Sequence, residues 1–584
     1  MMDALGLAKR TGRLSEVAIQ ANNLGNVLRE RGQYEEAIEY YKTALAIEDR
    51  AKNLEGRAYA LRNMGLTYAR MDQPEKAQTI LKDALALSQT IGNRYNELQC
   101  VLAIAEVEEN IGATTAQLSW TTAANLSRQM ALPEALWRAL FGMGRVTEDP
   151  SQSELFFEGA LLVLEQLGGG QTQAVAKYSA QSLYHQAIKL AVEQNDEARI
   201  FDLSERQKLR NLIDQLPVSD KTDVERALLR EARAAYQESV LLKIFEAPAS
   251  SLNSQRMAYQ QAKVRFSNTG SQILGGGTPA PIQIETLQEV LGSDTAALII
   301  NSGAPMVTTQ WVHRDRVKTT STEITVDELR QSLSQIEEAM KNFGPMDALL
   351  DDLSSKLLKP AQQWLAQGKH LVVIIPQAYS QLPVSALRVG DKTLIEEMTV
   401  STAPSATLLV ARLQSAKSSA PSRIRAIAPA ADLPFSKLEV SHIQTEGPTD
   451  QDLFEEELDA LHLAGHIRNR GLSYFEISKT ESITTNDVMR AEKTPALVTL
   501  STCEGLHRQS FLSLGHAFLV KGSQSVVAHN HRVSDLAAAV FMKHFYRHLK
   551  LGRAAALQKA ALETKQHFPH PAHWAGFQLM GDFR

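Results

Sequence analysis

Apolar residues recur at helical spacing along the first third of the chain, and the pattern repeats itself. One unit consists of two amphipathic segments, Asn22–Arg31 and Tyr34–Ala51, with a turn at Gly32-Gln33 between them. The pairs that mark a period of 40 residues are Ala4-Leu5, Ala44-Leu45 and Ala84-Leu85. Since a single unit of this kind cannot bury its apolar face alone, the repetition predicts a helical solenoid over residues 1–167.

Small residues fall at matching places in successive units. Gly25 and Gly65 are 40 residues apart, and so are Ala37 and Ala77. Small side chains let two helices approach closely, and larger ones then fill the space between units. The pattern Leu24-Gly25, Tyr34-x-x-Ala37 and Tyr41-x-x-Ala44-Leu45 resembles tetratricopeptide repeats, although the period exceeds their usual length of about 34 residues. We therefore expect elongated second helices; the alternative is a helical domain without repeats.

The array starts in the middle of a unit. Ala4-Leu5 corresponds to a second helix, whose first helix would precede Met1. We expect a lone helix that caps the array, because terminal repeats are often atypical. A shortened form of a longer protein is the alternative.

Helical periodicity continues after Gly168–Gly170, but without the phased small residues. The expected helices are Ala174–Glu193, Asn195–Leu216, Asp223–Phe245 and Ser251–Phe266. Acidic and basic residues are interspersed along them, which indicates solvated helix faces rather than a nucleic-acid-binding surface. Residues 168–274 are thus expected to form a helical connector at the end of the solenoid.

The pattern changes after Gly275–Pro281, which we expect to be a linker. Short apolar runs then alternate with helical patterns. The expected strands are Ala296–Asn301, Val307–His313, His370–Ile375, Arg423–Ala428, Ala460–Ala464, Ala496–Thr502 and Ser525–His529. The expected helices are Ile284–Leu291, Val326–Asn342, Met346–Gln367, Ser405–Ser415, Thr485–Ala491, Leu512–Lys521 and Ser534–Leu551. This alternation predicts an α/β domain whose mostly parallel sheet is covered by helices on both faces.

Composition and charge narrow the functional classes. Hydrophobic residues make up 44% and charged residues 22% of the 584 residues, as in a globular protein. A net charge of −5 gives no electrostatic basis for direct binding of nucleic acid or of an anionic membrane. Two cysteines, Cys100 and Cys503, exclude a disulfide framework and fit a reducing compartment. No apolar segment resembles a signal peptide or a membrane span, so we expect a cytoplasmic protein.

Two of the apolar runs end on reactive side chains. Leu461–His466 ends on an imidazole, and Ala496–Cys503 ends on a thiol. Chemistry gathers at the carboxyl ends of parallel strands, so neighbouring strands would place these two groups side by side. A thiol beside an imidazole is the minimum equipment of a cysteine nucleophile with a general base.

Residues 284–584 resemble the CHAT domain, a caspase-like cysteine peptidase domain that is usually found behind tetratricopeptide repeats. The resemblance rests on ordered blocks, namely Ile375-Pro376 with Leu382–Leu387, Pro404–Leu409, Leu461–His466, Leu500–Gly505, Ala517–Ala528 and His570–Phe577. It implies a caspase/separase-type layout with two halves. The first half, residues 282–414, is expected to be non-catalytic, and the second half, residues 423–584, to carry the dyad.

The resemblance also implies roles for individual residues. Cys503 is expected to be the nucleophile, and His466 the general base and later the acid that protonates the leaving amine. A buried structural cysteine is the alternative for Cys503. Backbone N–H groups of Cys503 and of residue 467 are expected to hold the oxyanion. The family has glycine after the catalytic histidine where this chain has Ile467, which indicates a site that is assembled only on activation.

A second departure from the family follows the strand Ser525–His529. His531 occupies the place of a family tryptophan, and Asp535 matches a family aspartate. We expect His531, Asp535 and Glu504 to line the substrate cleft; a loop without bearing on specificity is the alternative. His462 lies four residues before His466 and is expected to be a packed histidine and not a zinc ligand. We expect neither a metal site nor a cofactor in this protein.

The resemblance therefore implies a cytoplasmic endopeptidase with a protein substrate. An activating or inhibitory partner, a protein or a ribonucleoprotein, is expected to bind the repeats. Bacterial defence or cell-death signalling is the setting that the family implies. The alternative, motivated by Ile467 and His531, is a non-proteolytic scaffold with a degenerate caspase-like domain.

Overall fold

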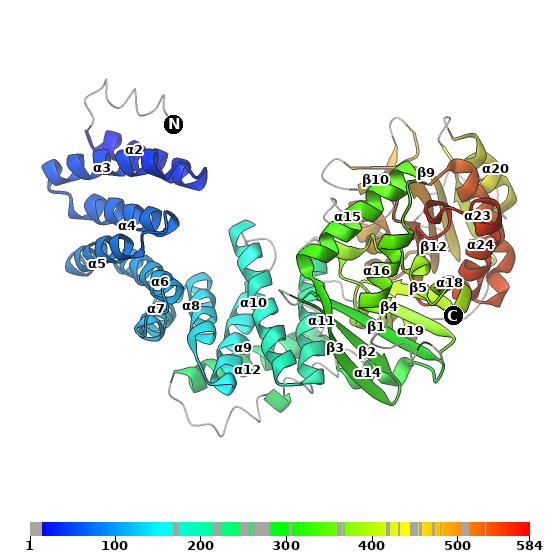
Figure 1. The fold of residues 1–584 in the computed structure, drawn as a ribbon, viewed down its shortest axis with the longest axis horizontal. Coiled ribbons are helices and arrows are strands. Elements are labelled where there is room, and N and C mark those ends of the chain that lie inside the picture. Colours follow the sequence, from blue (N-terminus) through cyan, green and yellow to red (C-terminus); the bar gives the residue numbers. More distant parts are fainter. Residues whose placement is uncertain are drawn as a thin grey trace. The chain divides into compact units, whose positions relative to one another are not determined.

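The computed structural model describes two units, each of which is considered by itself (Figure 1). One comprises Met1–Leu167 and Val240–Ala247, the other Gly168–Ser239 and Pro248–Arg584. The residues described are 14–167, 174–213, 224–245, 256–258, 261, 281–302, 306–358, 365, 368–415, 421–429, 433–443, 454, 458–469, 473–478, 481–503, 513–531 and 533–584. The expected capping helix at Ala4-Leu5, the break at Gly168–Gly170, most of Ser251–Phe266 and most of the linker Gly275–Pro281 lie outside them.

The first unit is built from consecutive helix pairs, as the repetition predicts. The helices are α2 (Leu14–Glu30), α3 (Tyr34–Ala51), α4 (Leu54–Arg70), α5 (Pro74–Thr90), α6 (Arg94–Asn110), α7 (Ala116–Gln129), α8 (Pro133–Val146) and α9 (Pro150–Gln166). The helix expected at Asn22–Arg31 begins earlier, at Leu14, because Val17, Ala18 and Ala21 extend its buried stripe. In α2 to α5 both helices of a pair have 17 or 18 residues, so the extra length of the repeat is not confined to the second helices.

The phased small residues do allow close packing. A Cβ atom on Gly25 would lie 2.5 Å from Cε1 of Tyr41, and one on Gly65 would lie 2.6 Å from Cγ of Leu81. Both partner side chains are fully buried. The prediction that glycine brings the two helices of a unit together is therefore confirmed at these positions.

A glycine later in the array gives a test of this packing. A Cβ atom on Gly142 of α8 would lie 2.2 Å from Cδ2 of Trp120, a buried ring of α7. Alanine gains about 1 kcal/mol of helix propensity over glycine, but overpacking against a fixed ring costs about 1–3 kcal/mol. We expect Gly142→Ala to lower the urea midpoint of the repeats, whereas Thr122→Ala on the exposed face of α7 should leave it within error. An unchanged or raised midpoint for Gly142→Ala would contradict the packing argument.

The second unit contains one twisted sheet in which twelve strands are described, in the order β11-β10-β9-β12-β13-β14-β7-β4-β1-β2-β3, with β8 also paired to β9. The strands of its first half are β1 (Thr295–Ser302), β2 (Met306–His313), β3 (Arg316–Thr325), β4 (His370–Ile374) and β7 (Thr399–Ala403). The others are β8 (Ile424–Ile427), β9 (Ala460–Asn469), β10 (Ser473–Glu476), β11 (Ser482–Thr484), β12 (Leu497–Cys503), β13 (Ser525–His529) and β14 (Phe577–Gly581). A separate pair, β5 (Arg388–Val389) and β6 (Lys392–Thr393), stands apart from this sheet.

The centre of each half is parallel, and the outer strands pair antiparallel. Strands β8, β9, β12 and β13 are parallel neighbours, as are β14, β7, β4 and β1. The edge hairpins β1-β2-β3 and β9-β10-β11 are antiparallel. The expected mixed fold, helical repeats followed by a mostly parallel α/β sheet, is confirmed.

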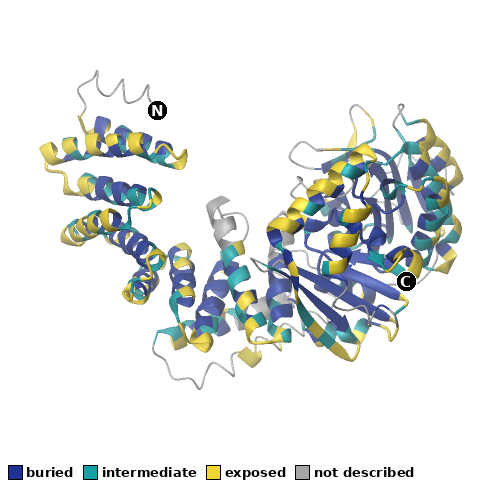
Figure 2. Cartoon of the chain, viewed as in Figure 1, coloured by how far each residue is buried: buried dark blue, intermediate teal, exposed yellow. Residues whose placement is uncertain are grey.

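Helices cover both faces of the sheet. They are α14 (Ile284–Val290), α15 (Val326–Asn342), α16 (Asp347–Leu357), α18 (Leu394–Glu397), α19 (Ala406–Ser415), α20 (Pro434–Ile443), α21 (Thr485–Arg490), α22 (Leu514–Lys521), α23 (Asp535–His548) and α24 (Arg553–His567). Alternate residues of β1 enter different cores: Leu298 packs with the core of α15, α16, α23 and α24, and Ile299 with that of α14 and α19. Figure 2 shows the strands buried and the outer helix faces exposed, which is the pattern of a sheet covered on both sides.

Part of the expected connector belongs with the sheet. The helices are α10 (Ala174–Glu193), α11 (Glu197–Ile213) and α12 (Val224–Ile244). Buried Glu205 of α11 accepts hydrogen bonds from the backbone N–H (3.0 Å) and hydroxyl (3.2 Å) of Thr407 at the start of α19. Gln310 of β2 donates to the carbonyl of Glu197 at 2.8 Å. Helix α11 is thus fixed to the sheet by buried polar contacts.

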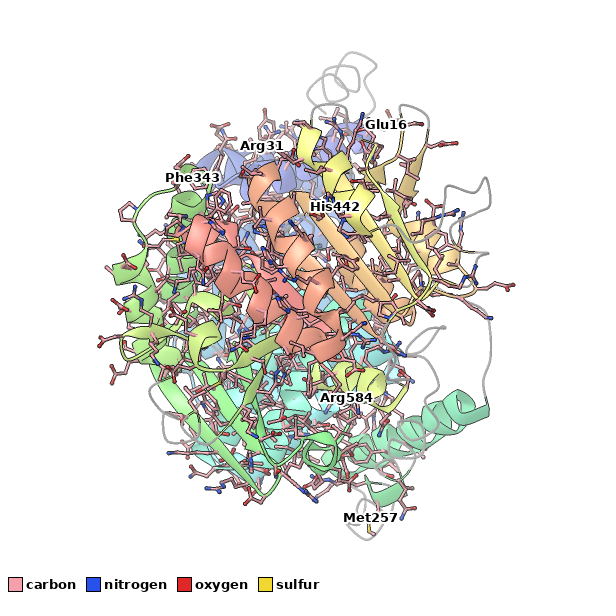
Figure 3. The ribbon with its side chains drawn as sticks, turned by 90° about the vertical axis from the view of Figure 1, so that its right-hand side faces the viewer. Glu16, Arg31, Met257, Phe343, His442 and Arg584 are labelled. Atoms are coloured by element: carbon pink, nitrogen blue, oxygen red, sulfur yellow. The ribbon has the colours of Figure 1, made fainter. Side chains whose placement is uncertain are left out.

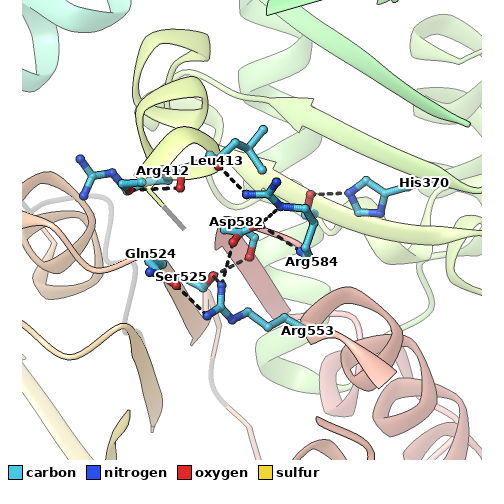
Figure 4. Close-up of polar contacts among 10 residues, drawn as sticks. His370, Arg412, Leu413, Gln524, Ser525, Arg553, Asp582 and Arg584 are labelled. Carbon is cyan, nitrogen blue, oxygen red and sulfur yellow. Dashed lines mark hydrogen bonds and ion pairs between the residues drawn. The ribbon is translucent and has the colours of Figure 1, made fainter. Parts of the chain in front are cut away.

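Strand β14 joins the two halves, because it lies between β13 and β7. Its end is held by a buried charge cluster in which Arg553 Nη1 lies 3.1 Å from Asp582 Oδ2 and donates to Ser525 Oγ at 3.0 Å (Figure 4). Arg584 lies 2.9 Å from the other oxygen of Asp582 and also donates to the carbonyl of Leu413.

The described helices include none that combines the length and apolarity needed to cross a membrane.

Candidate active site

The two strands that carry the candidate dyad are direct neighbours. Strands β9 and β12 pair parallel from Ala460↔Leu497 to His466↔Cys503. Neighbouring strands lie about 4.8 Å apart, so the backbones of His466 and Cys503 meet at one level at the carboxyl edge. The expected adjacency of the strands is confirmed, while the catalytic roles stay a prediction. His466 is half-buried, and of Cys503 only the backbone is described.

Strand β9 does not end at His466. It continues through Ile467, which pairs with Phe475 of β10, to Asn469. The glycine in this stretch, Gly465, precedes the histidine, and a Cβ atom there would lie 3.1 Å from Cε2 of Phe475. The residue after the histidine is therefore a paired strand residue, a position that suits the β-branched side chain of isoleucine.

A buried polar network lies on β9 and β12, four residues before the candidate dyad in each strand, and includes residues of α20 and α23. His462 Nε2 lies 2.7 Å from Glu439 Oε1 of α20, and both side chains are almost fully buried. Tyr546 of α23 lies between His462 Nδ1, at 3.3 Å, and Thr499 Oγ1 of β12, at 3.0 Å. Burial raises the pKa of Tyr546, so its hydroxyl stays protonated. His442, which is labelled in Figure 3, lies in the last turn of α20, the helix that carries Glu439. His462 is a packed histidine, as expected.

The segment after β13 connects the two halves. The imidazole of His531 lies in the interior, with an exposed fraction of 4%, and its Nε2 is 3.1 Å from the carbonyl oxygen of Gln381. Asn530 donates to the carbonyl of Ser380 at 3.0 Å, and so does Gln578 of β14 at 3.1 Å. In this structure His531 therefore contacts residue 381 of the first half, Asn530 and Gln578 bind residue 380, and the place of His531 in a substrate cleft stays a prediction.

Burial of these histidines predicts sensitivity to acid. Burial lowers the pKa of His531 to about 4 and that of His529 to about 3, whereas unfolded histidine titrates near about 6.5. Between pH 6.5 and about 4 the unfolded chain binds protons that the folded chain does not, so stability falls as the pH falls. We expect His531 to account for about 1–2 kcal/mol of lost unfolding free energy between pH 7.5 and pH 5.

Urea unfolding at the two pH values measures this loss. His531→Gln should reduce the difference between pH 7.5 and pH 5, because glutamine does not titrate. An equal difference in wild type and variant would show that the imidazole is solvated or already charged in the folded state.

Asp535 and Glu504 complete the predicted cleft residues. Asp535 begins α23, and its Oδ2 accepts a hydrogen bond of 2.8 Å from the backbone N–H of Phe435 at the start of α20. It thus ties the beginnings of two helices together. Glu504 lies outside the described residues.

A groove in the repeats is a second candidate site, which the sequence pattern alone does not reveal. It has a cavity volume of about 630 Å³. Its lining comes from α2, α4, α6 and α8 and is rich in arginine: Arg29, Arg62, Arg70, Arg138 and Arg145. The first helices of successive pairs therefore form one continuous surface.

Among the described residues, not every arginine of the groove is paired with a carboxylate. Arg145 forms two contacts with Glu109, at 2.5 and 2.7 Å, and Arg138 lies 2.9 Å from Glu106. Arg62 is largely buried, yet its described partners are neutral: Asn96 Oδ1 at 2.6 Å and Asn63 Oδ1 at 3.3 Å. Burial lowers the pKa of Arg62, because removing its positive charge from water costs free energy and no carboxylate among its described partners offsets that cost. An acidic group from a partner would offset that cost.

Two family models match the chain: a tetratricopeptide repeat over residues 16–90 and a CHAT domain over residues 347–582. Both resemblances drawn from the sequence are thereby confirmed. No curated protein matches the chain.

Three solved structures illustrate the structural similarities. BtubC (BKLC) from P. vanneervenii has 13% identity and a TM-score of 0.34 over 38% of this chain and 93% of its own. The Saccharomyces cerevisiae separase–securin complex has 9% identity and a TM-score of 0.43 over 97% of this chain and 53% of that one. The Rap protein complexed with competence and sporulation factor has 16% identity and a TM-score of 0.26 over 43% and 75%.

Proposed function

From a chain that carries tetratricopeptide repeats and a CHAT domain of the caspase-like peptidase families, we propose a cytoplasmic cysteine endopeptidase whose repeats bind a regulatory or substrate protein. The observation that supports this most directly is the register of β9 and β12, which pairs His466 with Cys503. Neighbouring strands in this register bring the backbones of the proposed nucleophile and base to one level of the sheet, which supports a role for the pair in covalent catalysis.

The reaction is peptide hydrolysis through a thioester. His466 takes the proton of the Cys503 thiol, and the sulfur attacks the scissile carbonyl carbon. The tetrahedral oxyanion is held by the backbone N–H groups of Cys503 and Ile467. His466 then protonates the leaving amine as the C–N bond breaks. Water, deprotonated by His466, cleaves the thioester and restores the thiol.

The partner is a protein segment that carries acidic side chains. Its support is the groove, in which the half-buried side chain of Arg62 has only neutral described partners and Arg70 has no described hydrogen-bond or ion-pair partner. A carboxylate over Arg62 would form charge-assisted hydrogen bonds in a partly desolvated site. Bacterial defence or cell-death signalling is the setting in which a protease under such control is useful, because unregulated proteolysis harms the cell.

A non-proteolytic scaffold is the second candidate. It is favoured by the continuous β9-β10 hairpin at Ile467, which puts a strand residue where the family has glycine. In that case the repeats would act alone as the functional part.

Thiol reactivity separates the two candidates without a known substrate. A base next to Cys503 raises its thiolate fraction, so at pH 6.5 iodoacetamide should alkylate Cys503 about tenfold faster than in the His466→Ala variant, as measured by peptide mass spectrometry. Cys100 is an internal control, because burial raises its pKa to about 11. Equal alkylation of Cys503 in wild type and variant, also when a bacterial lysate supplies partners for the repeats, would favour the scaffold.

A further inference from the structure

A cluster of potential metal ligands lies away from the candidate dyad, on the last two long helices of the sheet unit. His544 and His548 of α23 and Glu563 of α24 offer three ligand atoms that all lie within 4.8 Å of one another. We propose that these three residues bind a divalent transition-metal ion such as Zn²⁺.

The helix geometry brings the two imidazoles together. Residues four apart lie on one face of a helix, so His544 and His548 face α24 side by side. His548 Nε2 lies 2.9 Å from Glu563 Oε1, and His544 Nδ1 contacts the other oxygen, Oε2. Each imidazole thus uses a different oxygen of one carboxylate, and the three groups point to a common centre.

The charge balance of Glu563 also favours a cation at this point. Its described ion pairs are with the two histidines, and neither Lys543 nor Arg547, the exposed residues that precede His544 and His548, lies within ion-pair distance of it, although Arg547 acts on it electrostatically. Two imidazoles and one carboxylate form a set of borderline nitrogen and oxygen ligands that suits Zn²⁺, Co²⁺ or Fe²⁺ and not Mg²⁺ or Ca²⁺.

The spacing and the exposure fit a bound ion. Ligands at about 2.0–2.2 Å from Zn²⁺ lie about 3.5 Å apart in a tetrahedron, so small side-chain rotations within the observed cluster suffice. The three side chains keep exposed fractions of 18%, 22% and 31%, so water has access to the remaining coordination position. Without a metal, the same residues would be linked only by the hydrogen bond between His548 and Glu563 and by the contact of His544 with the same carboxylate.

A metal here would clamp α23 to α24. Helix α23 begins at Asp535, directly after the segment that follows β13, and α24 carries Arg553, which holds Asp582 after β14. The proposed site is thus a structural one that fixes the frame of the candidate catalytic half, and it is independent of whether the dyad cleaves peptides.

The test is isothermal titration of the full chain with Zn²⁺ in a Cys503→Ala background, which removes a competing thiol. We expect one ion bound per chain, with affinity reduced at least tenfold by His548→Ala and by the isosteric Glu563→Gln. His442→Ala, an exposed histidine of α20, should leave the affinity unchanged.

Two further measurements keep the outcome decisive. Circular dichroism of the variants confirms folding, and Co²⁺ should give visible absorption bands without a thiolate charge-transfer band. The proposal is overturned if the Cys503→Ala chain binds no Zn²⁺ below about 100 μM, or if Glu563→Gln and His548→Ala bind it as tightly as the parent.

Discussion

Cys503→Ala will abolish proteolysis by the full chain, and His466→Ala will reduce it by about 10⁴-fold. The thiol supplies the sulfur of the acyl-enzyme, and alanine has no group to replace it. Loss of the imidazole removes both the base that forms the thiolate and the acid that protonates the leaving amine. Because one group acts at both steps, the two single variants should be nearly as inactive as the double variant.

Terminal proteomics measures this effect without a known substrate. Wild-type chain is added to a bacterial lysate, new protein N-termini are labelled, and their number is compared with that from each variant. Cys100→Ala is the matched control, since Cys100 is buried in α6 and far in sequence from the dyad. Cleavage at the same sites by Cys503→Ala or His466→Ala would refute the dyad assignment.

His462→Ala will lower the unfolding free energy of the sheet unit by about 3–5 kcal/mol. The variant leaves Glu439 buried without the imidazole that lies 2.7 Å from it, and an uncompensated buried charge is strongly destabilising. Replacing both members by leucine should recover most of the loss, because an apolar pair removes the charge as well as its partner.

Urea unfolding of the single and double variants gives the coupling energy. Arg330→Ala is the control: its contact with Asp327, at 2.9 Å, joins two exposed side chains, and loss of a surface pair costs less than about 1 kcal/mol. A cost below about 1 kcal/mol for His462→Ala would contradict the stabilising role given to the buried contact between His462 and Glu439. Since β9 also carries His466, we expect faster hydrogen exchange along this strand in the variant.

Much of the fold follows from local sequence patterns. The repeats were predictable because glycine at 25 and 65 marks a packing distance that recurs with the period. Strands β9 and β12 were predictable because apolar runs of that length suit strands buried on both faces. For the candidate site, the same runs end at His466 and Cys503, so the order of the strands alone brings the pair together.

Several strands and helices could not be predicted, because their sequences show no clear apolar run or helical periodicity. Strand β3 is largely polar because it lies at the edge of the sheet, and β7 reads Thr-Val-Ser-Thr-Ala, although it is mostly buried. Helices α20 and α24 escaped prediction, and so did the partners that they bring to His462 and to the histidines of α23. Each of these contacts joins two different secondary-structure elements, so the periodicity of a single element does not encode it.

The place of β14 has a consequence for synthesis. This strand is the last of the sheet to be made, yet it lies in the middle, between β13 and β7. During synthesis the two halves of the sheet therefore emerge from the ribosome without the strand that joins them. The sheet can be completed only after residue 581 has emerged. Until then the edges of β13 and β7 are unpaired and prone to aggregation. The dyad strands β9 and β12 also lack the completed sheet that β14 provides next to β13. We expect a nascent chain to gain its thiol reactivity only after translation of this strand.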